Sequence, residues 1–201
     1  MNIKVVSVVF GLIMTAVSSS PAFAALIQGP AFISASTDIP TCDISICTGV
    51  GTDINEIADG DTSNLNGYAG ADGIVGIITL DLIGNYNLDS FSLWNDINVN
   101  QEGVESFMLH FYDPFDNLID STSTLFAPVG QFAAQTYEFS STVLNVSKVD
   151  LETLTLLGGG VGSRIEIREV AFNGTLVPVP AAAWLFASGL AAFGLVARRR
   201  A

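Results

Sequence analysis

Apolar and polar residues alternate in short runs along the middle of the chain. The alternation is clearest at residues 78–82, 90–94, 107–112 and 165–168. Successive side chains of a β-strand point to opposite faces of a sheet, so this period of two indicates strands with one buried face. Further strands are predicted at residues 118–120, 135–139, 146–157 and 170–172. No segment keeps the period of an amphipathic helix.

Clusters of Gly, Asn, Asp and Ser separate these runs. Asp-Pro-Phe-Asp-Asn at residues 113–117 is typical of a turn that joins two strands. Roughly six to eight short strands with such connections indicate antiparallel sheets packed face to face. The expected fold is therefore all-β, an antiparallel β-sandwich of the jelly-roll type, formed by residues 25–176 as a single domain.

The N-terminal end carries an export signal. Lys4 gives a basic start, residues 5–17 are mostly apolar, and Ala22-Phe23-Ala24 supplies the small residues that signal peptidase accepts. We expect cleavage after Ala24, which makes residues 1–24 a signal peptide. An uncleaved anchor is the alternative, but it needs about 20 spanning residues and explains neither Pro21 nor the Ala-x-Ala.

The C-terminal end contains an uncharged stretch at residues 177–197. A helix over residues 181–197 would rise about 25 Å at about 1.5 Å per residue, close to the thickness of a bilayer core. The basic tail of Arg198, Arg199 and Arg200 follows directly, and positive charge stays on the cytoplasmic side, so the domain is oriented outward. Pro178 and Pro180 keep the approach to this transmembrane helix extended.

The run from Val177 to Leu190 contains the two prolines and Trp184-Leu185-Phe186, and it closely resembles the PEP-CTERM sorting signal. The resemblance implies that residues 177–201 are recognised and cleaved by an exosortase in the inner membrane of a Gram-negative bacterium. The product would then reach the cell surface or an exopolysaccharide (biofilm) matrix. Val179 stands in place of the glutamate of Pro-Glu-Pro, which leaves the cleavage point open. An ordinary single-span anchor is the alternative.

Charge is distributed very unevenly along the chain. All 20 acidic residues lie between the two end segments, with only Lys148, Arg164 and Arg168 as basic partners. The middle domain therefore has a formal charge of −17, whereas the whole chain has −13. Such a field repels nucleic acid and anionic lipid, and it favours solubility or cation binding. Nucleic-acid binding is excluded on this ground.

Cys42 and Cys47 are the only cysteines, separated by four residues. An exported protein meets an oxidising compartment, where a pair this close forms a small disulfide loop. A zinc half-site is the alternative, but it lacks a second pair of ligands because His110 is the only histidine. A redox pair would more typically be Cys-x-x-Cys.

Residues 57–172 resemble discoidin-like, galactose-binding-like domains. The landmarks are the Asp-Gly-Asp loop at residues 59–61, the runs that begin at Ile78 and Phe91, and the last run, residues 165–170. In that group, the loop and a glutamate of the last strand hold a structural calcium. The resemblance implies Asp59, Asp61 and Glu169 as calcium ligands here, whereas Asn64 stands in place of a family threonine.

A physical argument about Glu169 points the same way. If Ile165 and Ile167 face inward, a period of two places Glu169 on the same face, where an unpaired carboxylate is costly. Calcium prefers several oxygen ligands, and an Asp-Gly-Asp turn brings them within reach. The alternatives are a bulge that turns Glu169 outward, or a salt bridge to Arg164 or Arg168.

Catalytic chemistry finds little support in the sequence. A Ser-His-Asp site could use only His110, which lies in the middle of an expected strand and is more typical of a surface or rim histidine. A glycoside hydrolase needs one carboxyl with a raised pKa, and no spacing indicates such a pair. The expected protein is not an enzyme.

Trp94, Tyr68 and Tyr112 would stack on sugar rings if they lie at loop ends, although such aromatics also fill sandwich cores. The preferred hypothesis is a non-catalytic surface or matrix protein that binds extracellular polysaccharide through a calcium-stabilised domain. Its processing partners would be signal peptidase and exosortase, with the inner membrane as a transient partner. The alternatives are a secreted carboxylate-dependent glycoside hydrolase and a structural matrix protein without a specific ligand.

Overall fold

The computed structural model describes residues 24–43, 45, 47, 51–63, 66–95, 102–128, 133–158 and 162–178. Within these ranges, no helix is long and apolar enough to cross a membrane. The predicted signal peptide up to residue 23 lies outside the described residues. So do Pro180, Trp184 and the three C-terminal arginines of the predicted sorting signal. Pro178 is exposed and is the last residue described.

The described chain is built from antiparallel strands and one short 3₁₀ helix, η1 (Ile54–Ala58). The strands are β1 (Ala25–Ile27), β2 (Ile33–Thr37), β3 (Tyr68–Ala69), β4 (Ile77–Asn95), β5 (Val104–Tyr112), β6 (Leu118–Ser121), β7 (Leu125–Phe126), β8 (Gln135–Leu156) and β9 (Glu166–Leu176). This architecture confirms the predicted all-β, antiparallel fold.

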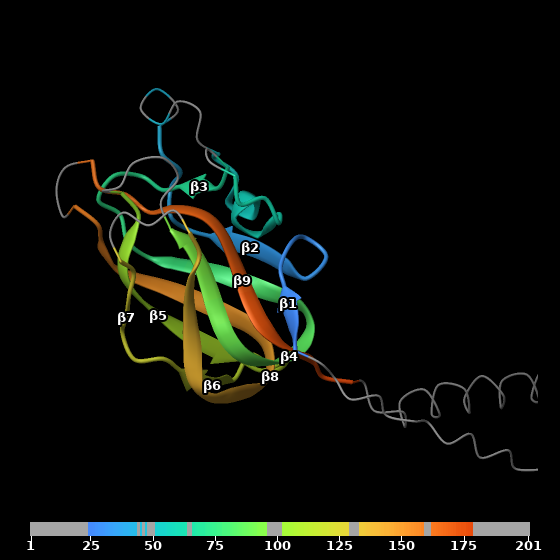
Figure 1. Ribbon diagram of the computed structural model, residues 1–201. Coiled ribbons are helices and arrows are strands. Elements are labelled where there is room, and N and C mark those ends of the chain that lie inside the picture. Colours follow the sequence, from blue (N-terminus) through green and yellow to red (C-terminus); the bar gives the residue numbers. More distant parts are fainter. Residues whose placement is uncertain are drawn as a thin grey trace, which may run out of the picture.

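Two long bent strands, β4 and β8, pass through both layers of the sandwich (Figure 1). The first sheet contains β1, β9, the C-terminal half of β4 and the N-terminal half of β8. The second sheet contains β2, the other halves of β4 and β8, then β5, with the short β6 and β7 paired to β5. The runs predicted as separate strands at residues 78–82 and 90–94 are thus two halves of one strand.

The bends fall where the backbone leaves ordinary strand geometry. The register between β4 and β8 shifts between Asp81 and Tyr86, and Gly84 has a φ of 127°. A β-carbon at Gly84 would meet the side chain of Leu176 at 3.2 Å, so glycine suits both the turn and the close packing. Asn145, with a φ of 59°, lies at the corresponding corner of β8. Asparagine tolerates this left-handed conformation better than most residues.

The core lies between the two sheets and is formed by the apolar positions of the alternating runs. The predicted inward-facing residues are at most 7% exposed: Ile78, Leu80, Leu82, Phe91, Leu93, Phe107, Leu109, Phe111, Ile165 and Ile167. Phe91 lies at the centre, with ring centroids 5.9 Å from Phe107 and 5.2 Å from Phe172. The period of two therefore identified the buried face correctly.

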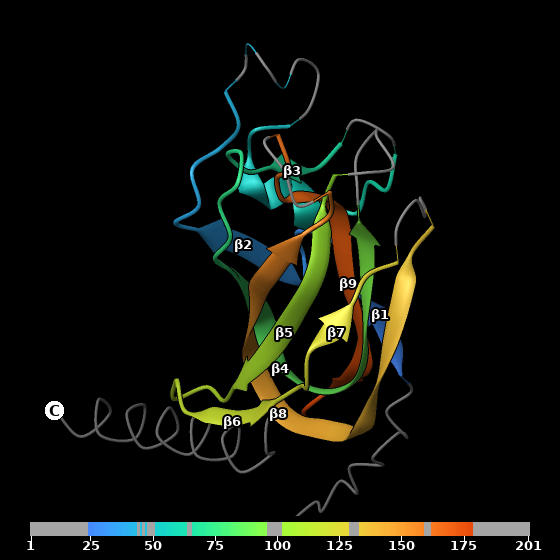
Figure 2. The same ribbon diagram turned by 90° about the vertical axis from the view of Figure 1, so that its left-hand side faces the viewer.

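The two ends of the sandwich differ. The base is formed by the corners of β4 and β8, the 113–117 turn and the end of β9, from which the chain continues toward its C-terminus (Figures 1 and 2). The loop end, opposite the base, carries η1, β3 and the segment around Cys42. Asp113 N donates to Asn117 O at 3.0 Å, which confirms the predicted turn.

Cys42 and Cys47 are joined by the predicted disulfide, with Cα atoms 6.0 Å apart. Nη1 of Arg164 lies 3.2 Å from Sγ of Cys42 and 2.9 Å from Sγ of Cys47, so the clip packs against a buried arginine. The disulfide thus fixes a loop against the start of the segment that leads into β9.

Candidate functional site

Glu169 lies on β9 and is fully buried, as expected, but it is covered by the loop that contains Gly60 and does not point into the core. The pairing of β9 with β4 shifts between Trp94–Glu169 and Asn95–Ile167, which makes Arg168 the extra residue of a β-bulge. The bulge places Glu169 on the face opposite to Val170, outside the core. The expectation that Glu169 shares the face of Ile165 and Ile167 is therefore wrong. A bulge is present, but it turns Glu169 beneath a loop and not into solvent.

The loop that contains Asp59 and Gly60 covers Glu169 on this outer face. Gly60 N donates to Oε2 of Glu169 at 3.2 Å, whereas Oε1 has no hydrogen-bond partner among the described residues. Burial is the main cause that raises the pKa of Glu169 to about 8; the Gly60 amide and the Gln28 side chain lower it, and the nearby Asp59 carboxylate adds to the rise. An ionised Glu169 therefore needs a positive partner at this place.

The side chain of Asn66 occupies an oxygen-lined position in the same loop. Its Nδ2 lies 3.1 and 3.3 Å from the two carboxylate oxygens of Asp59, 2.9 Å from the carbonyl oxygen of Asp61 and 3.4 Å from that of Glu56. An amide NH₂ group has only two hydrogens to donate to these four acceptors. The loop thus gathers more oxygen atoms than one amide satisfies.

This donor set fits calcium, which takes six to eight oxygen ligands, roughly, from carboxylates, carbonyls and amide side chains. Asp59 and Glu169 would contribute carboxylates, and Asp61 and Glu56 would contribute main-chain carbonyls. The carboxylate of Asp61 is turned to solvent and accepts from Ser63 N at 2.9 Å, so Asp61 faces the site through its carbonyl and not its side chain. Across the described ranges, no three His, Cys, Asp or Glu side chains gather as a metal site on their own.

The three aromatic residues predicted to bind ligand do not come together. Tyr68 is fully buried and donates its hydroxyl hydrogen to Ile39 O at 2.6 Å, so its ring is part of the core and cannot stack on a sugar. Trp94 is half-buried on the outer face of the first sheet, where it is the strand partner of Glu169. Tyr112 lies on the second sheet, and Lys148 Nζ is 4.3 Å from the centre of its ring.

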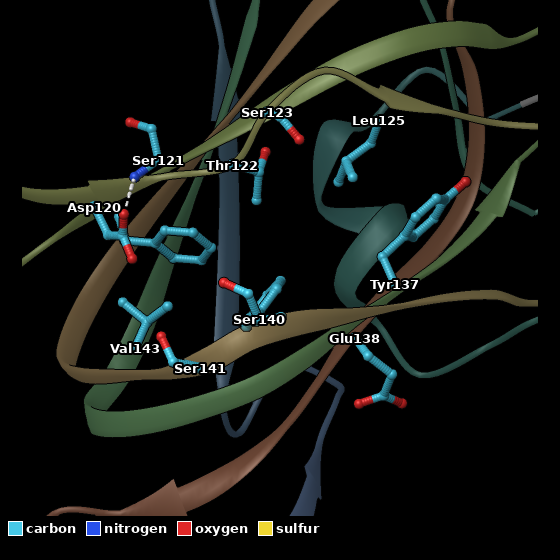
Figure 3. A pocket seen from close by; sticks show the side chains of 12 residues that line it. Asp120, Ser121, Thr122, Ser123, Leu125, Tyr137, Glu138, Ser140, Ser141 and Val143 are labelled. Atoms are coloured by element: carbon cyan, nitrogen blue, oxygen red, sulfur yellow. Dashed lines mark hydrogen bonds between the residues drawn. The ribbon is translucent and has the colours of Figure 1, made fainter.

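A different set of residues lines a groove along the open side of the sandwich (Figure 3). The groove runs between the first half of β8 and the segment from β6 to β7, and its cavity volume is about 240 Å³. Its lining residues are Phe111, Asp120, Ser121, Thr122, Ser123, Leu125, Tyr137, Glu138, Phe139, Ser140, Ser141 and Val143. Hydroxyl groups dominate the rim, and aromatic rings form the floor.

The floor of the groove is held by contacts between the two sheets. Phe139 of β8 packs edge-on against Phe111 of β5, with ring centroids 5.1 Å apart. Tyr137 contacts Phe107 in the same way at 5.2 Å, and its hydroxyl donates to Phe126 O at 3.2 Å. Burial raises the pKa of Tyr137 to about 12, so its hydroxyl stays protonated. The aromatic floor is therefore preformed.

Sequence reasoning missed this groove, because its two walls are separated along the chain. The run at residues 135–139 was predicted as a strand, and its alternation does place Tyr137 and Phe139 on one face. Nothing in the sequence shows that this strand lies at a sheet edge opposite β6 and β7. That neighbourhood exists only in the folded sandwich.

His110 joins three adjacent strands on the outer face of the second sheet. Its Nδ1 is 2.8 Å from Ser121 Oγ on β6, and its Nε2 is 2.8 Å from Glu152 Oε2 on β8. The order serine, histidine, carboxylate is that of a hydrolytic triad, but neither His110 nor Glu152 lines the groove. The arrangement instead ties the edge strand β6 to the sheet.

The groove does contain two carboxylates, Asp120 and Glu138, which bears on the hydrolase alternative. Figure 3 shows them at opposite walls, with the Glu138 carboxylate pointing away from the groove. A glycosidase directs both carboxylates at one bond. Glu169, whose pKa is raised as a general acid requires, lies beneath the Asp59 loop and does not line the groove.

No model of a protein family matches the sequence, and no curated protein matches it significantly. Solved structures do resemble the fold. The module CBM32-3 of a family 31 glycoside hydrolase from Clostridium perfringens has a TM-score of 0.58 and 16% identity, over 71% of this chain and 91% of that one.

Two further structures give a similar result. The family 32 carbohydrate-binding module of Clostridium perfringens NanJ, solved with galactose, has a TM-score of 0.53 and 13% identity, over 75% of this chain and 99% of that one. The C-terminal domain of a Bacteroides fragilis chitobiase has a TM-score of 0.57 and 17% identity, over 77% of this chain and 100% of that one. These neighbours are mainly non-catalytic modules, some of them from glycoside hydrolases. The chain thus has the antiparallel β-sandwich fold of family 32 carbohydrate-binding modules.

Proposed function

We propose that this protein is an exported, non-catalytic carbohydrate-binding protein of a bacterial surface or exopolysaccharide matrix. The observation that carries the proposal is the groove between β8 and the β6–β7 segment, with its aromatic floor and hydroxyl-rich rim. The fold it shares with modules solved in complex with galactose and with GalNAc-β-1,3-galactose supports the same class of ligand.

The groove suits a sugar because a sugar ring is amphipathic. Serine and threonine hydroxyls both donate and accept hydrogen bonds, which matches the hydroxyls of a glycan, and carboxylates accept from them. Apolar floors pack against the C–H faces of the ring, while the few polar groups fix its orientation. At about 240 Å³, the cavity is smaller than the roughly 300–1,000 Å³ typical of drug-sized ligands. We therefore expect one sugar unit of a longer chain to bind.

Calcium has a structural role in this proposal. Asp59, Glu169 and the carbonyls of Glu56 and Asp61 would hold the ion, and its charge would compensate the buried Glu169 carboxylate. The ion would join the loop after η1 to β9, and neither of these segments lines the groove. Removing calcium should therefore lower stability first and affect glycan binding only through the fold.

The two ends of the chain supply the route to the surface. The signal peptide of residues 1–24 would direct export, and the tail of residues 177–201 would be read by an exosortase before release to the matrix. Extracellular polysaccharide is abundant at that destination, which fits a domain that binds it. The strongly acidic surface suits a neutral glycan better than an anionic one.

Filling the groove should weaken glycan binding. In Figure 3 the Ser140 side chain faces the groove. Ser140→Trp should weaken binding of galactose, N-acetylgalactosamine or the best glycan of an array by at least about tenfold, or 1.4 kcal/mol. Isothermal titration calorimetry on the domain of residues 25–178 would measure this.

The matched control is Ser34→Trp on β2, an exposed strand serine outside the groove lining. It should bind as the wild type does. Binding that survives Ser140→Trp would place the glycan elsewhere on the domain. A wild-type domain that binds no glycan on the array would instead favour the structural matrix protein.

A further inference from the structure

Exposed apolar side chains concentrate at the base of the sandwich. Seven large apolar side chains of the described residues are more than half exposed, and five of them belong to the base: Ile83, Phe115, Leu118, Leu144 and Leu176, at 56, 83, 57, 63 and 56%. We call these five the basal residues. They come from the corner of β4, the turn before β6, the first residue of β6, the corner of β8 and the end of β9.

Hydrogen bonds and strand pairing bring these segments together. Leu176 is paired with Tyr86, its side chain lies beside Gly84, and Gly84 follows Ile83. Val146 pairs with the same Tyr86, which places the β8 corner next to the β4 corner. The turn before β6 joins the base through Tyr112, which pairs with Lys148 of β8. Strand pairing thus gathers exposed apolar side chains at one end of the domain, which is where such side chains serve as an interaction surface.

The chain also leaves the domain at this end. Val177 N donates to Asn85 O at 2.7 Å, so the last turn of the described chain is held against the corner of β4. The proposed membrane helix begins at Ala181, four residues later. At no more than about 3.6 Å per residue, this connection spans at most about 14 Å. Its two prolines remove further freedom.

This short connection restricts where the base can be. The polar headgroup layer on each side of a bilayer is roughly 5–8 Å thick. A base held within about 14 Å of the hydrocarbon edge therefore lies no more than about 9 Å beyond the headgroups, and it reaches them whenever the connection is less than fully extended. Exposed leucine, isoleucine and phenylalanine side chains gain free energy when they enter this region.

We propose that the base of the sandwich rests on the bilayer that holds the C-terminal helix, with the basal residues in the headgroup region of its outer surface. This inference depends on the proposed membrane helix. The lipid would be zwitterionic, because a domain of charge −17 is repelled by anionic headgroups. The loop end and the Asp59 loop then point away from the membrane, and the groove opens to the side.

Depth-dependent quenching tests the proposal on the full chain in phosphatidylcholine nanodiscs. Single cysteines at Leu118→Cys and Leu144→Cys would carry an environment-sensitive fluorophore, with the native disulfide left oxidised. Thr52→Cys, exposed at the loop end, is the matched control. Nitroxide headgroup lipids should quench the labels at 118 and 144 at least twofold more than the label at 52.

A label at Ala187→Cys separates the two claims. One outcome is that nitroxide acyl chains quench the label at 187, while the labels at 118 and 144 are quenched no more than the label at 52. The membrane helix then stands and the basal contact is overturned. If the label at 187 is also unquenched, the inference falls together with the anchoring on which it depends. Shielding of 118 and 144 that rises with protein concentration in detergent would assign the base to a second copy of the chain and would also overturn the proposal.

Discussion

In the presence of a chelator, the wild-type domain should lose stability as the pH rises from 5 to 8, whereas Glu169→Gln should not show this loss. Glu169 has a pKa of about 8 in the folded protein and about 4.5 when exposed. Between these values the folded state holds a proton that the unfolded state has released. Stability therefore falls as pH rises through this window, by at most about 1.4 kcal/mol per pH unit and about 3 kcal/mol by pH 7.

Calcium should remove this dependence, since the bound ion stabilises the ionised carboxylate. Thermal unfolding of both proteins at several pH values, with calcium and with chelator, would measure the effect. Calcium should raise the melting temperature of the wild type most at pH 8, and should raise that of Glu169→Gln much less. A wild-type profile that is the same with calcium and with chelator would contradict the proposed calcium site.

Two neighbouring variants sharpen the test. Asp59→Asn removes a carboxylate that faces the oxygen-lined position, so it should weaken the calcium response strongly. Asp61→Asn changes only a solvent-facing carboxylate, because the carbonyl of Asp61 is the group that faces the site. It should keep most of the response. Equal losses in the two variants would restore the side-chain role predicted from the sequence.

Arg164→Met should destabilise the domain by about 3–5 kcal/mol, the cost of leaving buried carboxylates without their cation. The guanidinium contacts Asp72 at 3.1 Å, Glu102 at 2.8 Å and Glu166 at 3.1 Å. Glu166 is only 1% exposed, so water cannot replace the arginine there. The melting temperature should fall by roughly 6–20 °C for a domain of this size.

Lys148→Met is the matched control for Arg164→Met. Lys148 forms an ion pair with Asp116, whose side chain is 77% exposed and can be solvated when the lysine is lost. Its removal should cost no more than about 1 kcal/mol. Chemical denaturation of the two variants would compare them directly, and similar costs would show that Arg164 is no more important than a surface charge.

The sequence by itself determined the local features of this protein. Alternation identified the inward-facing residues of the strands, because strand geometry imposes a period of two wherever one face is buried. The spacing of Cys42 and Cys47 predicted their disulfide, and Asp-Pro-Phe-Asp-Asn predicted the 113–117 turn. These features depend only on residues close together in the chain. The segments missed, such as β2 and β7, are short and carry too few positions to show a pattern.

Only the tertiary structure decided the features that join distant segments. The bulge at Arg168 turned Glu169 to the outer face, and the Asp59 loop, more than a hundred residues earlier, covers it there. The groove and the base likewise exist only where strands from different parts of the sequence meet. Tyr68 would stack on a sugar only at a loop end, and the structure places it in the core, since burial depends on what packs above a residue. Alternation fixes which face a side chain takes, but the partners across that face are set by how the two sheets stack.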